Sequence, residues 1–198
     1  AVGARDPGRA RSALWVGYWL AAIVAAFVML VLAVAPLALP RVGVRPDIAD
    51  GAAQFVWWRL PGMLPLYFFS ATRAYLQGLG ISRPMLWSIA VANVFNLLLD
   101  LILVFGTDSF HGLGIAGAAI STSICTTLQW LILVLSLPKA PANTVRAASW
   151  EPLRKAIALG TPISFQLGTD FSTFVIVGVL AAGLGPTSSA AHQIATAC

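Results

Sequence analysis

The sequence predicts an all-α membrane protein built as a polytopic bundle of transmembrane helices. Only 10% of its residues are charged, well below the roughly 25% of an average soluble domain. Apolar runs long enough to cross a bilayer as helices of about 20 residues recur along the chain. Lys and Arg lie singly or in small groups between these runs, without the clustered basic face that nucleic-acid binding requires. We therefore expect no nucleic-acid partner.

Four spanning helices are predicted before residue 138, and a fifth follows residue 155. The first opens with interfacial aromatics directly after several Arg residues, which marks a cytoplasmic edge. The second contains Pro61 and Pro65 and should be broken or kinked. Arg59 lies near its outer boundary, where we expect the long side chain to extend to the headgroups. The four predicted spans are 14–35, 52–76, 85–105 and 113–137.

The distribution of basic residues predicts the orientation of these helices. Of the twelve Lys and Arg, nine fall on one side of the predicted spans, and an excess of Lys and Arg marks the cytoplasmic side. Segment 138–155 holds four cations against Glu151 alone, so we expect it to be a cytoplasmic loop. The predicted order is inside at residue 1, outside near Asp47, inside near Arg83, outside near His111 and inside near Arg146.

The fifth span contains one carboxylate, Asp170, in an otherwise uncharged run from Leu159 to Gln193. At 100° per residue, Gln166, Thr169, Asp170 and Thr173 fall within an arc of about 100° and form one polar stripe. An ionised Asp in the bilayer core costs roughly 2.5 to 3.5 kcal/mol. We expect this stripe to bind a coupling ion or to line a cargo cavity. The alternative is an Asp that only bonds to a neighbouring helix.

A second polar face is predicted on the third span. Asn93, Asn96 and Asp100 stand at i, i+3 and i+7 and occupy an arc of about 60°. They could form a cation or proton site or a cavity wall. Alternatively, they could make interhelical hydrogen bonds worth roughly 0.6 to 2 kcal/mol each. In that case the Asp100→Asn substitution should impair function less than Asp170→Asn does.

Small residues four apart predict close helix packing. Gly114 pairs in this way with Ala118, and Gly117 with Ser121, at the start of the fourth span. The spacing recurs at Gly178 and Ala182.

No motif in the sequence supports an enzyme. It lacks a GxSG serine and an HExxH pair, and the residues before Asp170 do not form the GxGD motif of membrane aspartyl proteases. Cys125 and Cys198 have no metal-ligand spacing with either histidine. We expect no catalytic residue, no metal site and no cofactor apart from a coupling proton or sodium ion.

An ordered set of motifs resembles the multidrug and toxic compound extrusion (MATE) family. The motifs are GARDPGRAR, RLPGMLPLYFFSATRAYLQGLGISRP, NVFNLLLDLILVFG, GLGIAGAAISTS, LGTPISFQLGTDFSTF and AAGLGPTSSAAHQIA. The resemblance implies a twelve-helix antiporter fold of two six-helix lobes. It also implies export of cationic, amphipathic compounds in exchange for protons or sodium ions. The chain looks like helices three to seven and the beginning of eight, so we expect it to be a piece of a longer protein.

The resemblance also assigns parts of the chain. Segment 1–137 would be the remainder of the first lobe, 138–155 the cytoplasmic inter-lobe loop and 156–198 the start of the second lobe. Asp170 matches a membrane-embedded Glu of the seventh helix, and Asp100 matches a recurrent Asp of the fifth. The implied protein is multi-pass in the plasma or inner membrane and monomeric at full length. Its partners would be the lipid bilayer and cationic or amphipathic small molecules. A lipid-linked precursor flippase of the same superfamily and a nonfunctional or structural membrane fragment are the alternatives.

Overall fold

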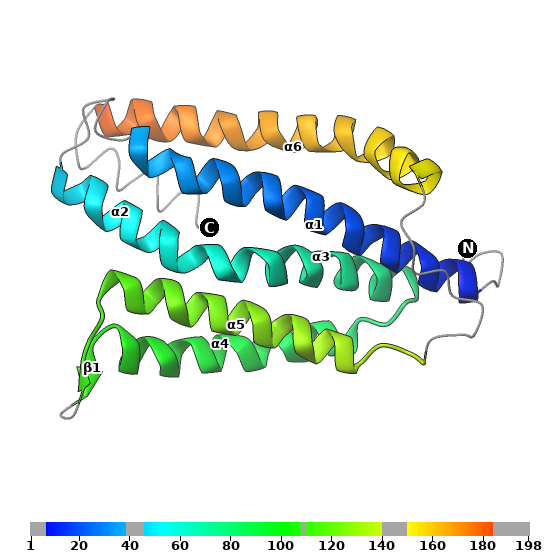
Figure 1. Ribbon diagram of the computed structural model, residues 1–198, viewed down its shortest axis with the longest axis horizontal. Helices are drawn as coiled ribbons and strands as arrows, with labels where there is room; N and C mark the ends of the chain where they lie inside the picture. Colours follow the sequence, from blue (N-terminus) through cyan, green and yellow to red (C-terminus); the bar gives the residue numbers. More distant parts are fainter. Residues whose placement is uncertain (1–6, 39–45, 108–109, 140–149, 184–198) are drawn as a thin grey trace. The chain divides into compact units, whose positions relative to one another are not determined.

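The computed structural model describes residues 7–38, 46–107, 110–139 and 150–183. These belong to two compact units, Ala1–Ser149 and Trp150–Cys198. Within the described residues, the first unit has five α-helices, a short 3₁₀ helix and a two-stranded hairpin, and the second has one long helix (Figure 1). In chain order the elements are α1 (Pro7–Ala38), α2 (Pro46–Arg59), η2 (Leu60–Gly62), α3 (Met63–Gly78), α4 (Arg83–Leu103), β1 (Gly106–Thr107), β2 (Phe110–His111), α5 (Ile115–Leu135) and α6 (Trp150–Gly183).

Three of the described helices are long and apolar enough to cross a membrane. They cover Gly8–Ala38, Arg83–Leu103 and Ile115–Leu135, and they correspond to the first, third and fourth predicted spans. The prediction of a helical membrane protein is confirmed. Helix α1 contains Pro36 in its last turn and is described to Ala38, three residues beyond the predicted end of the first span.

The second predicted span is broken, as the prolines predicted. Helix α2 ends at Arg59, η2 covers Leu60–Gly62, and α3 resumes at Met63. Pro61 lacks an amide hydrogen and its ring disturbs the preceding turn, which frees carbonyl groups of α2. The buried Ser123 hydroxyl of α5 donates to the carbonyl of Trp58 at 3.3 Å. The break is therefore stabilised from the neighbouring helix.

Helices α4 and α5 lie side by side and are joined by the β1–β2 hairpin (Figure 1). Gly106 pairs with His111 in antiparallel register. A Cβ on Gly117 would clash with the Leu103 carbonyl oxygen and lie 2.5 Å from the Leu103 carbonyl carbon. The predicted packing role of Gly117 is thus confirmed. Gly114, with φ +56°, precedes α5 and supplies a backbone conformation that other residues rarely adopt.

The apolar core of the first unit lies between α3 and α5. Phe69, Leu76 and Leu133 are buried together there. Tyr18 of α1 joins this core through a 2.7 Å hydrogen bond between its hydroxyl and that of Thr72. A row of aromatic rings connects α1, α3 and α5. Their centroids lie 5.7 Å apart for Trp15–Tyr18, 5.1 Å for Tyr18–Phe68 and 5.3 Å for Phe68–Trp130.

The second unit is described from Trp150 to Gly183 as one helix, α6. Residues 150–155, predicted as the end of a loop, are therefore helical. Glu151 lies in the first turn of α6 and Lys155 donates a 2.6 Å hydrogen bond to it. That hydrogen bond holds the pKa of the Glu151 carboxyl below its usual value. The assignment of 1–137, 138–155 and 156–198 to lobes and an inter-lobe loop stays a prediction.

Candidate functional site

A polar cluster lies between α4 and α5. Ser121, whose side chain is fully buried, donates a hydrogen bond to the Asp100 carboxylate. The Asn96 amide donates to the same hydroxyl oxygen at 3.3 Å. Cys125, one turn further along α5, is buried near Asn96 and Asp100. The cluster therefore gathers a carboxylate, an amide, a hydroxyl and a thiol at one helix–helix contact.

Residue spacing explains how this cluster forms. Asn96 and Asp100 are four apart on α4, and Ser121 and Cys125 are four apart on α5, so each pair shares a helix face. Gly117 lies one turn before Ser121 and lets the two backbones approach. The sequence had indicated Ser121 only as a small packing residue. Its spacing from Gly117 was the signal that could have located it opposite Asp100.

Asn93 is not part of the cluster. Its side chain is exposed on α4, whereas those of Asn96 and Asp100 are partly buried against α5. The helix turns 100° per residue, so Asn93 lies at the edge of the predicted polar face rather than at the contact. The structure brings together two of the three residues predicted for that face.

The predicted stripe on α6 is helical throughout. Gln166, Thr169 and Thr173 are exposed. The two threonine hydroxyls donate to carbonyls one turn earlier, at 3.0 Å each. The side chain of Asp170 lies outside the described part of the structure, so its role in ion coupling stays a prediction.

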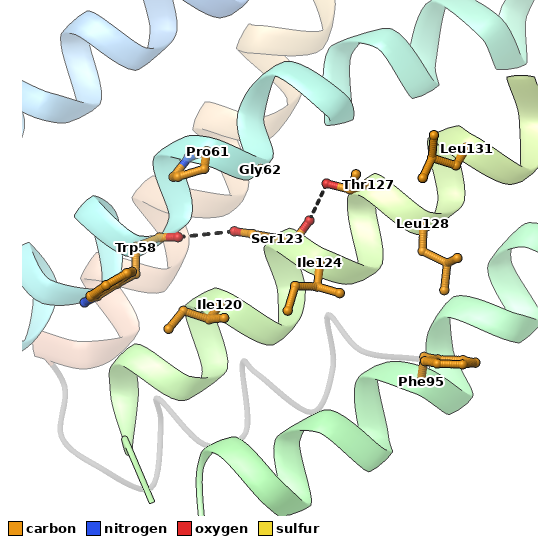
Figure 2. A pocket seen from close by; sticks show the side chains of 10 residues that line it. All are labelled: Trp58, Pro61, Gly62, Phe95, Ile120, Ser123, Ile124, Thr127, Leu128 and Leu131. Atoms are coloured by element: carbon orange, nitrogen blue, oxygen red, sulfur yellow. Dashed lines mark hydrogen bonds between the residues drawn. The ribbon is translucent and has the colours of Figure 1, made fainter.

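A cavity of about 570 Å³ opens within the first unit (Figure 2). Its lining includes the sequence neighbours of Asn96 and Ser121 but none of the cluster residues. Its walls are mostly apolar, with two aromatic rings and two hydroxyl groups, and its volume lies within the range of small-molecule sites in proteins. The lining residues are Trp58, Pro61, Gly62, Phe95, Ile120, Ser123, Ile124, Thr127, Leu128 and Leu131.

The cavity and the cluster share α4 and α5. Phe95 of the cavity precedes Asn96 of the cluster, and Ile120 precedes Ser121. On the opposite side the cavity is closed by the break between α2 and α3, through Trp58 and Gly62. No pattern in the sequence indicates this cavity, because its walls combine residues of the α2–α3 break with residues of α4 and α5 that lie far from them along the chain.

Arg59 corrects a prediction. Its guanidinium turns into the bundle, where Nη2 donates to the Thr126 hydroxyl at 3.4 Å and Nη1 is buried. Gly62 makes this possible, because a Cβ there would clash with Arg59 Nη1 and lie 2.7 Å from Ser123 Oγ. The expected extension of Arg59 to the headgroups is therefore wrong.

Among the residues whose placement the structure describes, no group of three or more His, Cys, Asp or Glu could hold a metal ion. The candidate site is instead an oxygen-rich cluster beside an apolar cavity.

The helices and the candidate site define a helical membrane protein with polar groups held between its spans. A family model described as MatE matches residues 1–102, and the chain belongs to this family. The predicted resemblance is confirmed.

Curated relatives are named as multidrug resistance proteins. A probable NorM of Acinetobacter baylyi is 30% identical over 205 residues, covering 98% of this chain and 45% of the relative. A probable NorM of Streptococcus pneumoniae is 27% identical, covering 84% of this chain and 38% of the relative. MdtK of Edwardsiella ictaluri is 27% identical, covering 90% of this chain and 41% of the relative. The chain thus spans less than half the length of these relatives. No solved structure matches it significantly.

Proposed function

We propose that the protein is a secondary active efflux transporter of the plasma or inner membrane. It exchanges protons or sodium ions for amphipathic, cationic drugs or toxins, and it acts as a monomer without enzymatic activity. The observation that carries this proposal is the Asn96–Ser121–Asp100 cluster beside an apolar cavity of about 570 Å³. Family membership and the names of the relatives support it.

The cluster offers oxygen atoms suited to a small cation. Asp100 supplies a carboxylate, Ser121 a hydroxyl and Asn96 an amide oxygen. A proton would bind on the Asp100 carboxylate, whereas sodium would take ligands from all three groups. In either case the bound ion neutralises a charge that is costly to hold inside a membrane.

The cavity supplies a place for cargo. Trp58 and Phe95 offer faces for flat apolar groups, while Ser123 and Thr127 offer hydroxyls. A cationic cargo favours the ionised carboxylate, and an ion bound at Asp100 removes that attraction. Ion and cargo therefore weaken each other's binding reciprocally, which is the coupling that antiport requires.

The α6 stripe is the second place where coupling would occur. Asp170, with Gln166, Thr169 and Thr173 on the same face, would bind a proton or ion on a second helix. Asp170→Asn keeps size and hydrogen bonding but removes the titratable charge, so it should preserve membrane insertion and abolish ion-driven efflux.

Asp100→Asn tests the proposal at the cluster. The variant keeps an oxygen that can accept from Ser121, so interhelical bonding alone predicts normal transport. Coupling at Asp100 instead predicts at least tenfold slower ion-driven efflux at normal membrane levels. The measurement is export of a fluorescent cationic dye from cells or vesicles under an imposed ion gradient.

Ser121→Ala and Thr122→Ala form a matched pair for the same assay. Ser121 reaches Asp100, whereas Thr122 donates to Ala118 of its own helix at 2.8 Å. Ser121→Ala should raise the ion concentration needed for half-maximal efflux, and Thr122→Ala should not. Full ion-driven efflux by Asp100→Asn would refute coupling at this cluster.

A further inference from the structure

We propose that Arg11 binds the phosphate of an anionic phospholipid, at the end of the first unit where α1 begins and α3 ends. The headgroup would lie on Arg11, and one acyl chain would follow α1 into the bilayer. This inference requires that α1, which is long and apolar enough to cross a membrane, lies in one. It does not depend on the proposed transport function.

The guanidinium of Arg11 is held in place but lacks an acceptor. It lies 5.7 Å from the centre of the Tyr75 ring of α3, in a cation–π contact that leaves its charge without a counterion. Its Nε and Nη1 are buried and have no hydrogen-bond partner among the described residues. Arg11 as a whole is partly exposed, so Nη2 is the nitrogen left to reach a ligand. The side chain is thus prepared for an anion.

The described residues place no carboxylate at this end of the first unit. Those of this unit that carry one are Asp47 and Asp50, on α2, and Asp100, on the far half of α4 (Figure 1). The end itself is basic, because Arg83 opens α4 and Lys139 follows α5, and both are exposed. Basic sites between membrane helices bind anionic headgroups. An anionic headgroup would therefore be attracted here without repulsion from a described acidic residue.

The position of Arg11 along α1 matches the depth of lipid headgroups. The candidate membrane span of α1 covers Gly8–Ala38, so Arg11 lies three residues, or about 4.5 Å, from its start. Trp15 follows one turn later, and Trp is enriched where the apolar core of a membrane meets its headgroups. A phosphate at Nη2 would stand at the level it already occupies in a bilayer. This depth favours a phospholipid over a soluble phosphate as the ligand.

Side chains at intervals of four residues lead from Arg11 along α1. After Trp15 this row continues with Trp19, Ile23 and Phe27, which are 47%, 53% and 66% exposed. Residues four apart are neighbours on a helix surface and form a continuous ridge. Exposed apolar side chains along this ridge offer an acyl chain a path from the headgroup toward the bilayer core. A molecule that carries both a phosphate and a chain therefore fits this surface better than either part alone.

Binding of three probes to the complete protein in detergent tests the site without any mutation. Dioleoyl phosphatidylglycerol has an anionic headgroup, dioleoyl phosphatidylcholine has the same chains and no net charge, and glycerol 3-phosphate has no chains. Native mass spectrometry of a titration gives the dissociation constant of the first bound molecule. We expect phosphatidylglycerol to bind at least about fivefold more tightly than phosphatidylcholine, the effect of one cation near the headgroups.

Two results of this titration would overturn the inference. Equal affinities for the two lipids would show that no cation recognises the headgroup. Glycerol 3-phosphate bound as tightly as phosphatidylglycerol would assign the site to a soluble phosphate and remove the role of the lipid.

Variants assign the preference to Arg11. Arg11→Gln should remove the preference for phosphatidylglycerol, whereas Arg11→Lys keeps the charge and should retain part of it. Arg73→Gln is the matched control, because Arg73 is an exposed arginine of the same end that lies two residues before Tyr75, on the opposite side of α3. It should keep the natural preference. An equal loss in Arg11→Gln and Arg73→Gln would contradict the proposal, because general surface charge would then attract the lipid.

Thermal unfolding in detergent separates a lost site from a lost fold. A lipid that binds the folded protein raises its melting temperature. Added phosphatidylglycerol should therefore raise the melting temperature of the natural protein and of Arg73→Gln more than phosphatidylcholine does. Arg11→Gln should respond equally to the two lipids. A response of Arg11→Gln as selective as that of the natural protein would overturn the role of Arg11.

Discussion

Gly117 is the residue that sets the distance between α4 and α5. A Cβ at this position would clash with the Leu103 carbonyl oxygen and lie 3.0 Å from the Val104 amide nitrogen. Both atoms belong to the backbone, so they cannot move aside as a flexible side chain could. The Ser121–Asp100 hydrogen bond one turn later depends on this close approach.

Gly117→Ala should therefore destabilise the protein by about 1 to 3 kcal/mol, the typical cost of overpacking. The matched control is Gly78→Ala, because a Cβ on Gly78 would meet nothing within 4 Å. Thermal unfolding of the purified variants in detergent measures the stability of each. A Gly117→Ala variant as stable as Gly78→Ala would show that α4 and α5 can separate at no cost.

At the residue scale, the sequence predicted a position correctly where helical spacing alone decides which way the side chain faces. The spacing of Asn96 and Asp100 predicted that they face the same way, and both contact Ser121. It failed for Arg59, because the direction of a long side chain depends on space left by other residues. Gly62, three positions later, provides that space, and no periodicity in the sequence reveals it.

The break between α2 and α3 is the element on which the cavity depends. Trp58, Pro61 and Gly62 come from the break and form one wall of the cavity. The Ser123 hydroxyl of α5 contacts this wall through the Trp58 carbonyl at 3.3 Å (Figure 2). It shares its single proton between this carbonyl and that of Ala119 in its own helix, at 2.8 Å.

Ser123→Ala would leave the Trp58 carbonyl without this partner. The expected cost is about 1 to 3 kcal/mol of stability, because a buried polar group would lose its hydrogen bond. Cargo affinity should fall as well, because the wall is no longer held. Thr122→Ala, which removes only a bond within α5, is the control. If the two variants have equal melting temperatures and equal dye affinities, Ser123 does not support the wall.

At the element scale, the existence of helices was predictable and some of their ends were not. Long apolar runs predicted α1, α4 and α5, and two prolines predicted the break. Helix α6 begins at Trp150, earlier than expected. Glu151 and Pro152 in its first turn are ordinary signals of a helix start, but the charge pattern of a cytoplasmic loop concealed them.

Basic side chains gather at one end of the first unit. The chain turns from α3 into α4 at that end, where Arg73 and Arg83 are exposed. Arg11 of α1 lies there too, with its guanidinium 5.7 Å from the centre of the Tyr75 ring. Lys139 follows α5 and is exposed two residues after Leu137, which packs against the core at this end. An excess of cations marks the cytoplasmic side of a membrane protein.

Single-cysteine labelling of the complete protein tests this orientation. A cysteine replacing Arg83 should react only from the inside, and one replacing His111, which is exposed in β2, only from the outside. The background needs Cys125 and Cys198 replaced. Labelling of position 83 in intact cells by a membrane-impermeant reagent would reverse the predicted topology.

The hairpin between α4 and α5 also bears on how the protein is made. Two spanning helices joined by a short antiparallel turn, with Gly117 packed against Leu103, have close contacts between residues near in sequence. Such contacts can form as soon as both helices leave the ribosome. Asp100 would then be bonded to Ser121 when the pair enters the lipid, so its carboxylate would never face hydrocarbon alone during biosynthesis.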